Sequence, residues 1–196
     1  MSTKKTDRYR QLSLQSLEER NLLAGNVFGY INGSTLNFVG DLQDNAMAFE
    51  EIAPNTVRAA GLAGTTINGL PSQNFTLSPI ESISIYFGNG RNQVIVHNLS
   101  LTDTPDGSLS IGTSDLDDMI VLDRVATSDR VSIQSYDGDD QIIINQLETN
   151  DFYTSTRAGN DHVEIFSSRV NEFELFAGDG FDQISIERFA VNNDFR

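Results

Sequence analysis

The sequence predicts an all-β fold, a right-handed parallel β-helix (solenoid) of about seven coils, preceded by a short N-terminal helix. Two observations predict the coils. Blocks of 21 residues repeat without internal gaps, and each block holds two stretches of alternating apolar and polar residues around a turn rich in Gly, Asp and Asn. A block of this size cannot bury its apolar side alone, so successive blocks must stack and share a core.

The first 24 residues differ in charge from the rest of the chain. They contain five basic and three acidic residues, whereas residues 25–196 carry eight Arg, no Lys and 25 acidic residues. This break predicts a segment boundary near Gly25. Residues 9–24 are rich in Leu, Gln, Glu and Arg, which are good helix formers, so we expect a helix that ends before Gly25.

A short string in this segment carries a resemblance. LEERNLL, residues 17–23, resembles the LEPR-xLL segment that opens many large secreted or surface proteins of bacteria, with Glu19 in place of the proline. The resemblance implies that residues 1–24 are an export or targeting signal and that the protein is secreted or held at the surface of a bacterial cell. The alternative is an amphipathic helix that caps the domain.

Residues 25–80 are expected to form degenerate N-terminal coils of the same β-helix. Residues 34–54 fit the columns of the repeat, with Leu36 and Phe38 at apolar positions before the turn. Residues 55–80, rich in Gly, Thr and Ser, are predicted to form one irregular coil with an insert.

Residues 81–196 contain the regular coils. Positions 3, 14 and 16 of the block are apolar in all five copies, which indicates strands with one buried face before and after the turn. Leucine-rich repeats have a similar period, but their LxxLxLxxN pattern is absent. The five blocks are residues 81–101, 107–127, 129–149, 150–170 and 171–191.

Composition excludes several classes of function. A net charge of −15 argues against nucleic acid and anionic membranes as partners, because both require a basic surface. The absence of Cys excludes disulfides, thiol catalysis and zinc–thiolate sites. No apolar run approaches the ~20 residues that a membrane span needs.

The turns are the predicted site of chemistry. AGDGFDQIS, residues 177–185, resembles the hemolysin-type (RTX-like) calcium-binding nonapeptide GGxGxDxUx, and the other turns match it in part. The resemblance implies Ca²⁺ bound along one edge of the stack. The metal ligands that it implies are Asp118, Asp137, Asp140, Asp161, Asp179 and Asp182.

Position 12 of the block supports calcium on physical grounds and also offers an alternative. Stacked carboxylates ~5 Å apart repel by about 1 kcal/mol in water-like surroundings and about 3 at an effective dielectric of 20, and a bound cation removes this repulsion. Asp, Asn and Gly are also common turn formers, so the column can simply close the turns. The residues at position 12 are Asn92, Asp118, Asp140, Asp161 and Asp182.

An enzyme is the less favoured prediction. A polysaccharide-processing β-helix, either a lyase or a glycosidase, could use the carboxylate pairs Asp117/Asp118 and Asp139/Asp140, with Asp161 one coil on. However, such pairs recur along the stack instead of gathering at one place. His97 and His162 occupy different columns, and neither lies in a nucleophile motif.

The sequence therefore predicts a non-catalytic, exported, acidic β-helix that acts as a structural or adhesion module outside the cell. Calcium is the expected cofactor, and extracellular glycans or surface proteins are the expected partners. End-to-end self-association is a further expectation, because an open sheet end can pair with another chain.

Overall fold

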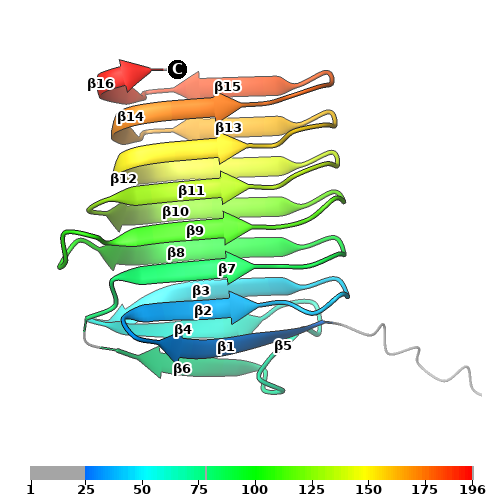
Figure 1. Cartoon of the computed structure of the whole chain (residues 1–196), viewed down its shortest axis with the longest axis vertical. Helices are drawn as coiled ribbons and strands as arrows, with labels where there is room; N and C mark the ends of the chain where they lie inside the picture. Colours follow the sequence, from blue (N-terminus) through cyan, green and yellow to red (C-terminus); the bar gives the residue numbers. More distant parts are fainter. Residues whose placement is uncertain (1–24, 78, 196) are drawn as a thin grey trace, which may run out of the picture.

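The structure, a computed structural model, describes residues 25–77 and 79–195, and the predicted N-terminal helix lies outside these residues. The described part contains sixteen β-strands and no helix, so it holds no helix that could cross a membrane. The strands form two facing sheets that meet at strand β12, which bends from one sheet into the other (Figure 1).

The front sheet in Figure 1 holds nine strand segments. In spatial order they are β5 (Thr66–Ile67), β1 (Asn26–Asn32), β2 (Thr35–Val39), β7 (Ser82–Tyr86), β9 (Ser108–Gly112), β11 (Arg130–Gln134), the second half of β12 (Gln141–Ser155), β14 (Arg169–Phe176) and β16 (Ala190–Phe195).

The back sheet holds eight strand segments. In spatial order they are β6 (Ser72–Thr76), β4 (Thr56–Gly61), β3 (Ala46–Ala53), β8 (Gln93–Leu101), β10 (Met119–Thr127), the first half of β12, β13 (His162–Phe166) and β15 (Gln183–Glu187).

From β7 onward the chain alternates between the sheets, and all pairing is parallel. From β7 onward, front strands run to the right in Figure 1 and back strands to the left while the chain climbs, which makes a right-handed coil. The predicted right-handed parallel β-helix is therefore confirmed for this part of the chain. Strand β1, by contrast, runs antiparallel to β2.

The predicted register is confirmed as well. Val94, Ile120 and Ile142 pair in neighbouring strands and are at most 1% exposed, as the apolar columns require. The inward side chains of the two sheets fill one continuous core. In the last coil Ile184 is 46% exposed, because no described strand lies beyond β15 to cover it.

The count of about seven coils was too high. Five regular coils are present, and β2 and β3 supply the strands of one more. Residues 55–80 do not form a coil, because hairpins turn the chain back: β4 runs antiparallel to β3, and β6 antiparallel to β4. Asn55, with φ +58°, makes the turn after β3, a conformation that Asn tolerates better than most residues. Antiparallel strands therefore close this end.

Each coil turns twice. At the second corner, position 18 of the block adopts a positive φ in all five coils, between +48° and +57°. The side chains at this position differ in type, so the sequence pattern did not predict a corner here. They are Asn98, Arg124, Gln146, Ser167 and Arg188.

Glycine is required where the first turns stack closely. Gly138 has a φ of +133°, and a Cβ added there would lie 2.6 Å from the carbonyl carbon of Leu116 in the preceding coil. Both the backbone conformation and the neighbouring coil therefore exclude a side chain at this position.

We predict that Gly138→Ala lowers the free energy of unfolding by about 2–5 kcal/mol, because it combines backbone strain with overpacking. Gly33→Ala is the matched control. Gly33 also has a positive φ, +61°, but an added Cβ would meet nothing within 4 Å, so the expected loss is about 1–2 kcal/mol. Urea unfolding measures both losses, and equal losses would contradict the close stacking of the turns.

Candidate functional site

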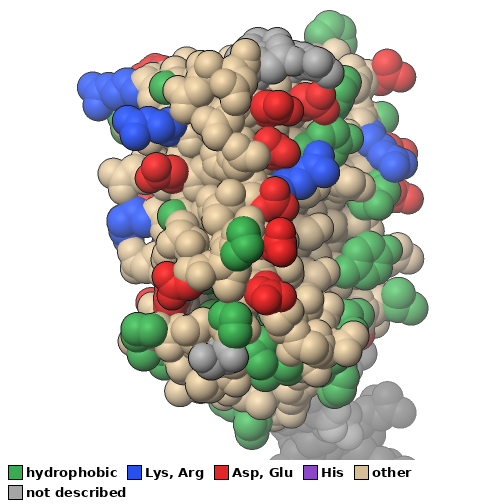
Figure 2. All heavy atoms as spheres, turned by 60° about the vertical axis from the view of Figure 1, so that its left-hand side comes forward, with side chains coloured by type: hydrophobic (Ala, Val, Ile, Leu, Met, Phe, Trp, Pro, Cys, Tyr) green, Lys and Arg blue, Asp and Glu red, His purple; other side chains and the backbone are tan. Residues whose placement is uncertain are grey.

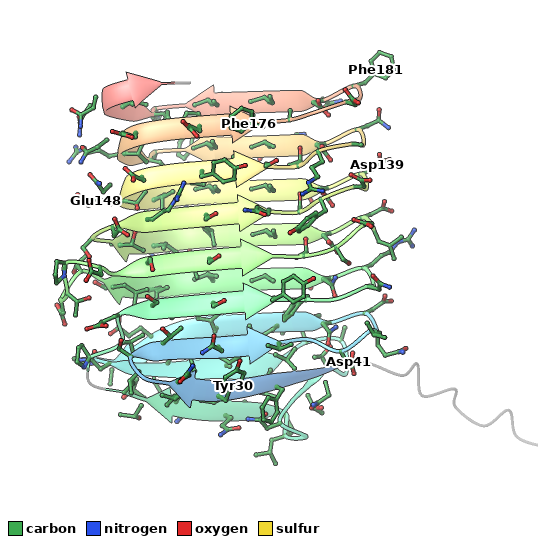
Figure 3. All side chains as sticks on the ribbon, viewed as in Figure 1. Tyr30, Asp41, Asp139, Glu148, Phe176 and Phe181 are labelled. Atoms are coloured by element: carbon green, nitrogen blue, oxygen red, sulfur yellow. The ribbon has the colours of Figure 1, made fainter. Side chains whose placement is uncertain are left out.

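The first turns of successive coils lie one above another and form a single edge, here called the turn edge. It is on the right in Figure 3, where Asp41, Asp139 and Phe181 are labelled. The turn edge consists of residues 40–45, 87–92, 113–118, 135–140, 156–161 and 177–182.

Position 12 forms an inner ladder of hydrogen bonds along this edge. In each coil the backbone N–H of the residue at this position donates to the side-chain Oδ1 of its equivalent in the next coil. The five steps are Asn45 to Asn92 (3.2 Å), Asn92 to Asp118 (2.6 Å), Asp118 to Asp140 (2.9 Å), Asp140 to Asp161 (2.9 Å) and Asp161 to Asp182 (3.1 Å).

Position 11 forms an outer ladder that runs in the opposite direction. Here the N–H of the later coil donates to the Oδ1 of the earlier one. The four steps are Arg91 to Asp44 (2.9 Å), Asp139 to Asp117 (3.2 Å), Asn160 to Asp139 (2.8 Å) and Phe181 to Asn160 (3.1 Å). Between Arg91 and Asp117, where the earlier residue has no carboxylate, an ion pair of 3.2 Å joins the side chains.

The two ladders account for most of the Asp and Asn in the turns. Each N–H that donates to a side chain has lost its place in the strand pairing, and a buried N–H without a partner is costly. The short side chains of Asp and Asn supply the acceptor from the neighbouring coil. In both ladders these side chains join the turn of one coil to the turn of the next.

The inner carboxylates are buried. Asp118, Asp140 and Asp161 are 3%, 2% and 1% exposed. Burial raises the pKa of Asp140 to about 8, partly offset by the nearby Ser135 hydroxyl and the N–H of Asp118. Burial also raises the pKa of Asp118 and of Asp161, partly offset by the nearby hydroxyls of Thr113 and Thr156 and by backbone N–H groups. Charge is thus disfavoured at these three positions of the inner ladder.

The second carboxylate oxygen distinguishes Asp from Asn in this column. Within the described residues, Oδ2 of Asp140 and Oδ2 of Asp161 are buried and make no hydrogen bond. In Asn92 the corresponding Nδ2 donates to the carbonyls of Gly88 (3.1 Å) and Gly90 (2.8 Å). The Asp oxygens thus occupy a position that suits a hydrogen-bond donor or a cation.

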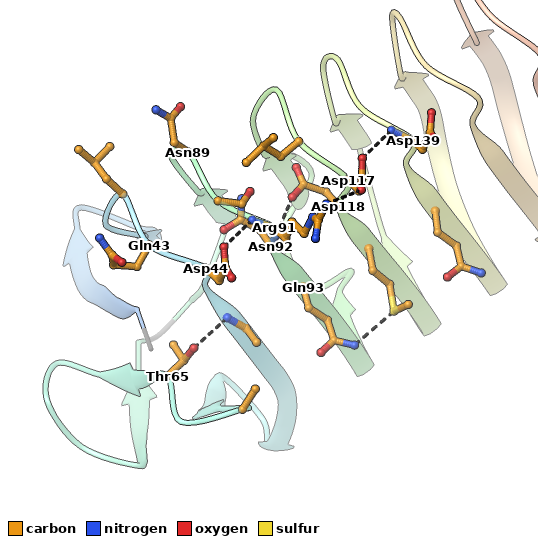
Figure 4. Close-up of a pocket in the computed structure, with 17 residues that line it drawn as sticks. Gln43, Asp44, Thr65, Asn89, Arg91, Asn92, Gln93, Asp117, Asp118 and Asp139 are labelled. Atoms are coloured by element: carbon orange, nitrogen blue, oxygen red, sulfur yellow. Dashed lines mark hydrogen bonds and ion pairs between the residues drawn. The ribbon is translucent and has the colours of Figure 1, made fainter. Parts of the chain in front are cut away.

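A shallow groove opens where the turn edge meets the antiparallel strands (Figure 4). Asp44, Asp117 and Asp139 lie on one side of it with Arg91, joined by the outer-ladder bonds and the ion pair. The exposed Leu116 also lines the groove. The acidic groups of the groove already accept hydrogen bonds from the neighbouring coil. Their position therefore suits the joining of coils better than the binding of a substrate.

The structure divides the six predicted metal ligands into two groups. Asp118, Asp140, Asp161 and Asp182 belong to the inner ladder, whereas Asp137 and Asp179 lie exposed at the tips of the turns. Among the described residues, no three acidic or His side chains converge on one point. A calcium ion here would need backbone carbonyls and water for most of its 6–8 ligands.

The outer ladder was missed as a unit. In the sequence analysis, Asp117 and Asp139 appear only in the carboxylate pairs of the enzyme alternative. The recurrence of Asp117, Asp139 and Asn160 at position 11 could have indicated a second column of acceptors. The direction of its hydrogen bonds follows only from the stacked turns.

Acidic side chains also follow one another along the opposite edge of the molecule, which faces the viewer in Figure 2. Glu148, labelled on the left in Figure 3, lies on this edge and is exposed. Negative charge is thus distributed over both edges of the flattened coil, and solvent and salt screen the exposed part of it.

We predict that stability falls as the pH rises from about 4 to 8, because folded Asp140 keeps its proton to about pH 8 whereas an unfolded Asp releases it near pH 4. Its stabilising contribution is complete below pH 4 and is lost as the pH approaches 8. Asp140→Asn should therefore be more stable than the native chain at pH 8, by about 1–3 kcal/mol, and should show a smaller change with pH.

Urea unfolding at pH 5 and pH 8 in the presence of a chelator tests this prediction. Asp137→Asn, at an exposed turn tip, is the matched control and should behave like the native chain. A lower stability of Asp140→Asn at pH 8 would show that the native carboxyl is ionised and paired.

Comparisons with known proteins give no information about the function of this chain. No family model, no curated protein and no solved structure matches the sequence or the fold.

Proposed function

We propose that this protein is a non-catalytic, exported, acidic β-solenoid that serves as a structural or adhesion module at the bacterial cell surface or outside the cell. The observation that carries the proposal is the pair of opposed ladders at the turn edge. They commit the recurring Asp and Asn residues to joining one coil to the next, which gives a rigid stack with long, regular faces.

The same geometry speaks against the polysaccharide-processing alternative. Asp118 and Asp140 are 3% and 2% exposed, and each accepts a backbone N–H through Oδ1. A general acid or nucleophile must reach its substrate, so these carboxylates are poorly placed for glycosidic bond cleavage. We therefore do not assign them a catalytic role.

Export rests on the resemblance of residues 17–23 to the LEPR-xLL segment. We predict that the full chain, produced in its bacterial host, is recovered at the cell surface or in the medium, and that removal of residues 1–24 retains it inside the cell. Immunodetection in cell fractions measures this. A second variant exchanges Leu22 and Leu23 for Ser, and it should also reduce export, because the resemblance implies that these leucines are recognised. Equal export of all three forms would contradict a targeting role.

Calcium binding is the second candidate, and one observation favours it. The unpartnered, buried oxygens of Asp140 and Asp161 stand in successive coils, where the Asn coils place an amide beside turn carbonyls. A calcium ion there would meet hard oxygen donors and would relieve the repulsion between the carboxylates. Weak sites suffice, because extracellular modules bind calcium with dissociation constants near 10⁻⁴–10⁻³ M.

We predict that Ca²⁺ at ten to a hundred times its dissociation constant stabilises the native chain by about 1–3 kcal/mol relative to EDTA. The double variant Asp140→Asn, Asp161→Asn should lose this response, because it replaces both free oxygens by amides. Thermal unfolding followed by circular dichroism measures the change. Asp137→Asn with Asp179→Asn is the control at the turn tips. An unchanged melting temperature of the native chain with Ca²⁺ would exclude calcium sites that matter for folding.

A further inference from the structure

The front sheet carries an outer surface of unusual composition for so acidic a chain. The outward positions of β1, β2, β7, β9 and β11 hold no acidic residue, although the whole chain has a net charge of −15. Most are small and polar, and from β2 to β11 they repeat at the regular spacing of a parallel sheet. The hydroxyl and amide residues among them are Asn26, Asn32, Thr35, Asn37, Ser82, Ser84, Ser108, Ser110, Ser132 and Gln134.

Exposed aromatic side chains accompany these polar groups along the length of the sheet. Phe28 and Tyr30 on β1 are 56% and 40% exposed, Tyr86 on β7 is 53% exposed, and Phe176 on β14 is 52% exposed. Figure 3 shows Tyr30 and Phe176 on this face, near opposite ends of the stack. Six strand spacings separate β1 from β14, which amounts to about 29 Å.

The rings are held in place by their neighbours. The ring of Tyr86 extends over Gly112 of the next coil, where an added Cβ would lie 3.2 Å from its Cδ2. Phe28 and Tyr30 contact each other with 5.6 Å between ring centroids, and Tyr153 packs against Phe176 with 5.8 Å between centroids. Rings fixed in this way lose little conformational entropy when a ligand stacks on them.

We infer that this face, called here the aromatic–serine face, binds an extended neutral polysaccharide that lies along the axis of the stack. The C–H side of a sugar ring packs on an aromatic ring, and its hydroxyls both donate to and accept from Ser, Asn and Gln side chains. The inference rests on the proposed function as an adhesion module and names its partner.

The charge of the protein favours a neutral polysaccharide over an anionic or a cationic one on this face. An anionic polymer would meet the field of a strongly negative protein with few cationic groups on this face to pair with. A cationic polymer would be drawn instead to the acidic turn edge and to the acidic edge opposite it. From β1 to β11 the sheet face offers neutral donors, neutral acceptors and aromatic rings, which match an uncharged chain of sugars. Near Phe176 the outward positions of β12 and β14 also hold Asp151, Glu172 and Glu174, which would repel an anionic polymer.

Affinity electrophoresis of the full chain tests the inference, with hydroxyethyl cellulose, laminarin and mannan as neutral polymers, a polyuronate as the anionic polymer and chitosan as the cationic one. We expect retardation by at least one neutral polymer and none by the polyuronate. Tyr86→Ala and Phe176→Ala should each weaken binding at least ten-fold, whereas Tyr86→Phe should retain it. Phe166→Ala, which removes an exposed ring from the back sheet, is the control and should bind like the native chain.

Three results would overturn the inference: no retardation by any neutral polymer, tighter binding of the polyuronate, or an equal loss in Phe166→Ala. Circular dichroism of each variant establishes that the fold is intact, since all the altered side chains are exposed. Failure here leaves the export and calcium experiments unaffected, because they concern residues 1–24 and the turn edge. The proposed module and its proposed ligand can thus fail separately.

Discussion

The structure depends on one hydrogen bond that is repeated from coil to coil, from a backbone N–H at the first turn to a side-chain oxygen of the neighbouring coil. Strand pairing satisfies the backbone within the sheets, but the chain must leave that pairing at each turn and would bury unpaired donors there. Asp and Asn at positions 11 and 12 solve this problem in opposite directions. The close stacking of the turns, the need for Gly138 and the burial of the inner carboxylates all follow from it.

The same carboxylates thus serve the hydrogen bonds between coils and are the groups that could ionise or bind a cation. One oxygen of Asp140 is used by the ladder, whereas the other is buried without a partner and raises the cost of ionisation. Asn92 solves the same geometric problem without that cost, because its amide donates to turn carbonyls. Retention of Asp at positions 140 and 161 therefore sacrifices stability at neutral pH unless a proton or a cation occupies the position beside the free oxygen.

The sequence was most informative where a single physical requirement recurs. The buried columns could be predicted because Val94, Ile120 and Ile142 all face one core, and period-two alternation reports that directly. The closing hairpins could not, because the weak apolar pattern of residues 55–80 is compatible with either strand direction and the turn at Asn55 decides it. The site was predicted as a column of carboxylates, but their hydrogen-bond partners come from residues 21 to 26 positions away and depend on the stacking itself.

The inner ladder also bears on how such a chain can change in length over evolution. Every interior coil gives one N–H to its successor and offers one Oδ1 to its predecessor, so its two interfaces are interchangeable with those of its neighbours. After duplication or loss of one 21-residue block in the interior, every N–H donor of the inner ladder would still have an acceptor. The register of the strands would not change. Copy number can thus drift by whole blocks while the core and the flat outer faces are preserved, which gives the molecule an adjustable reach.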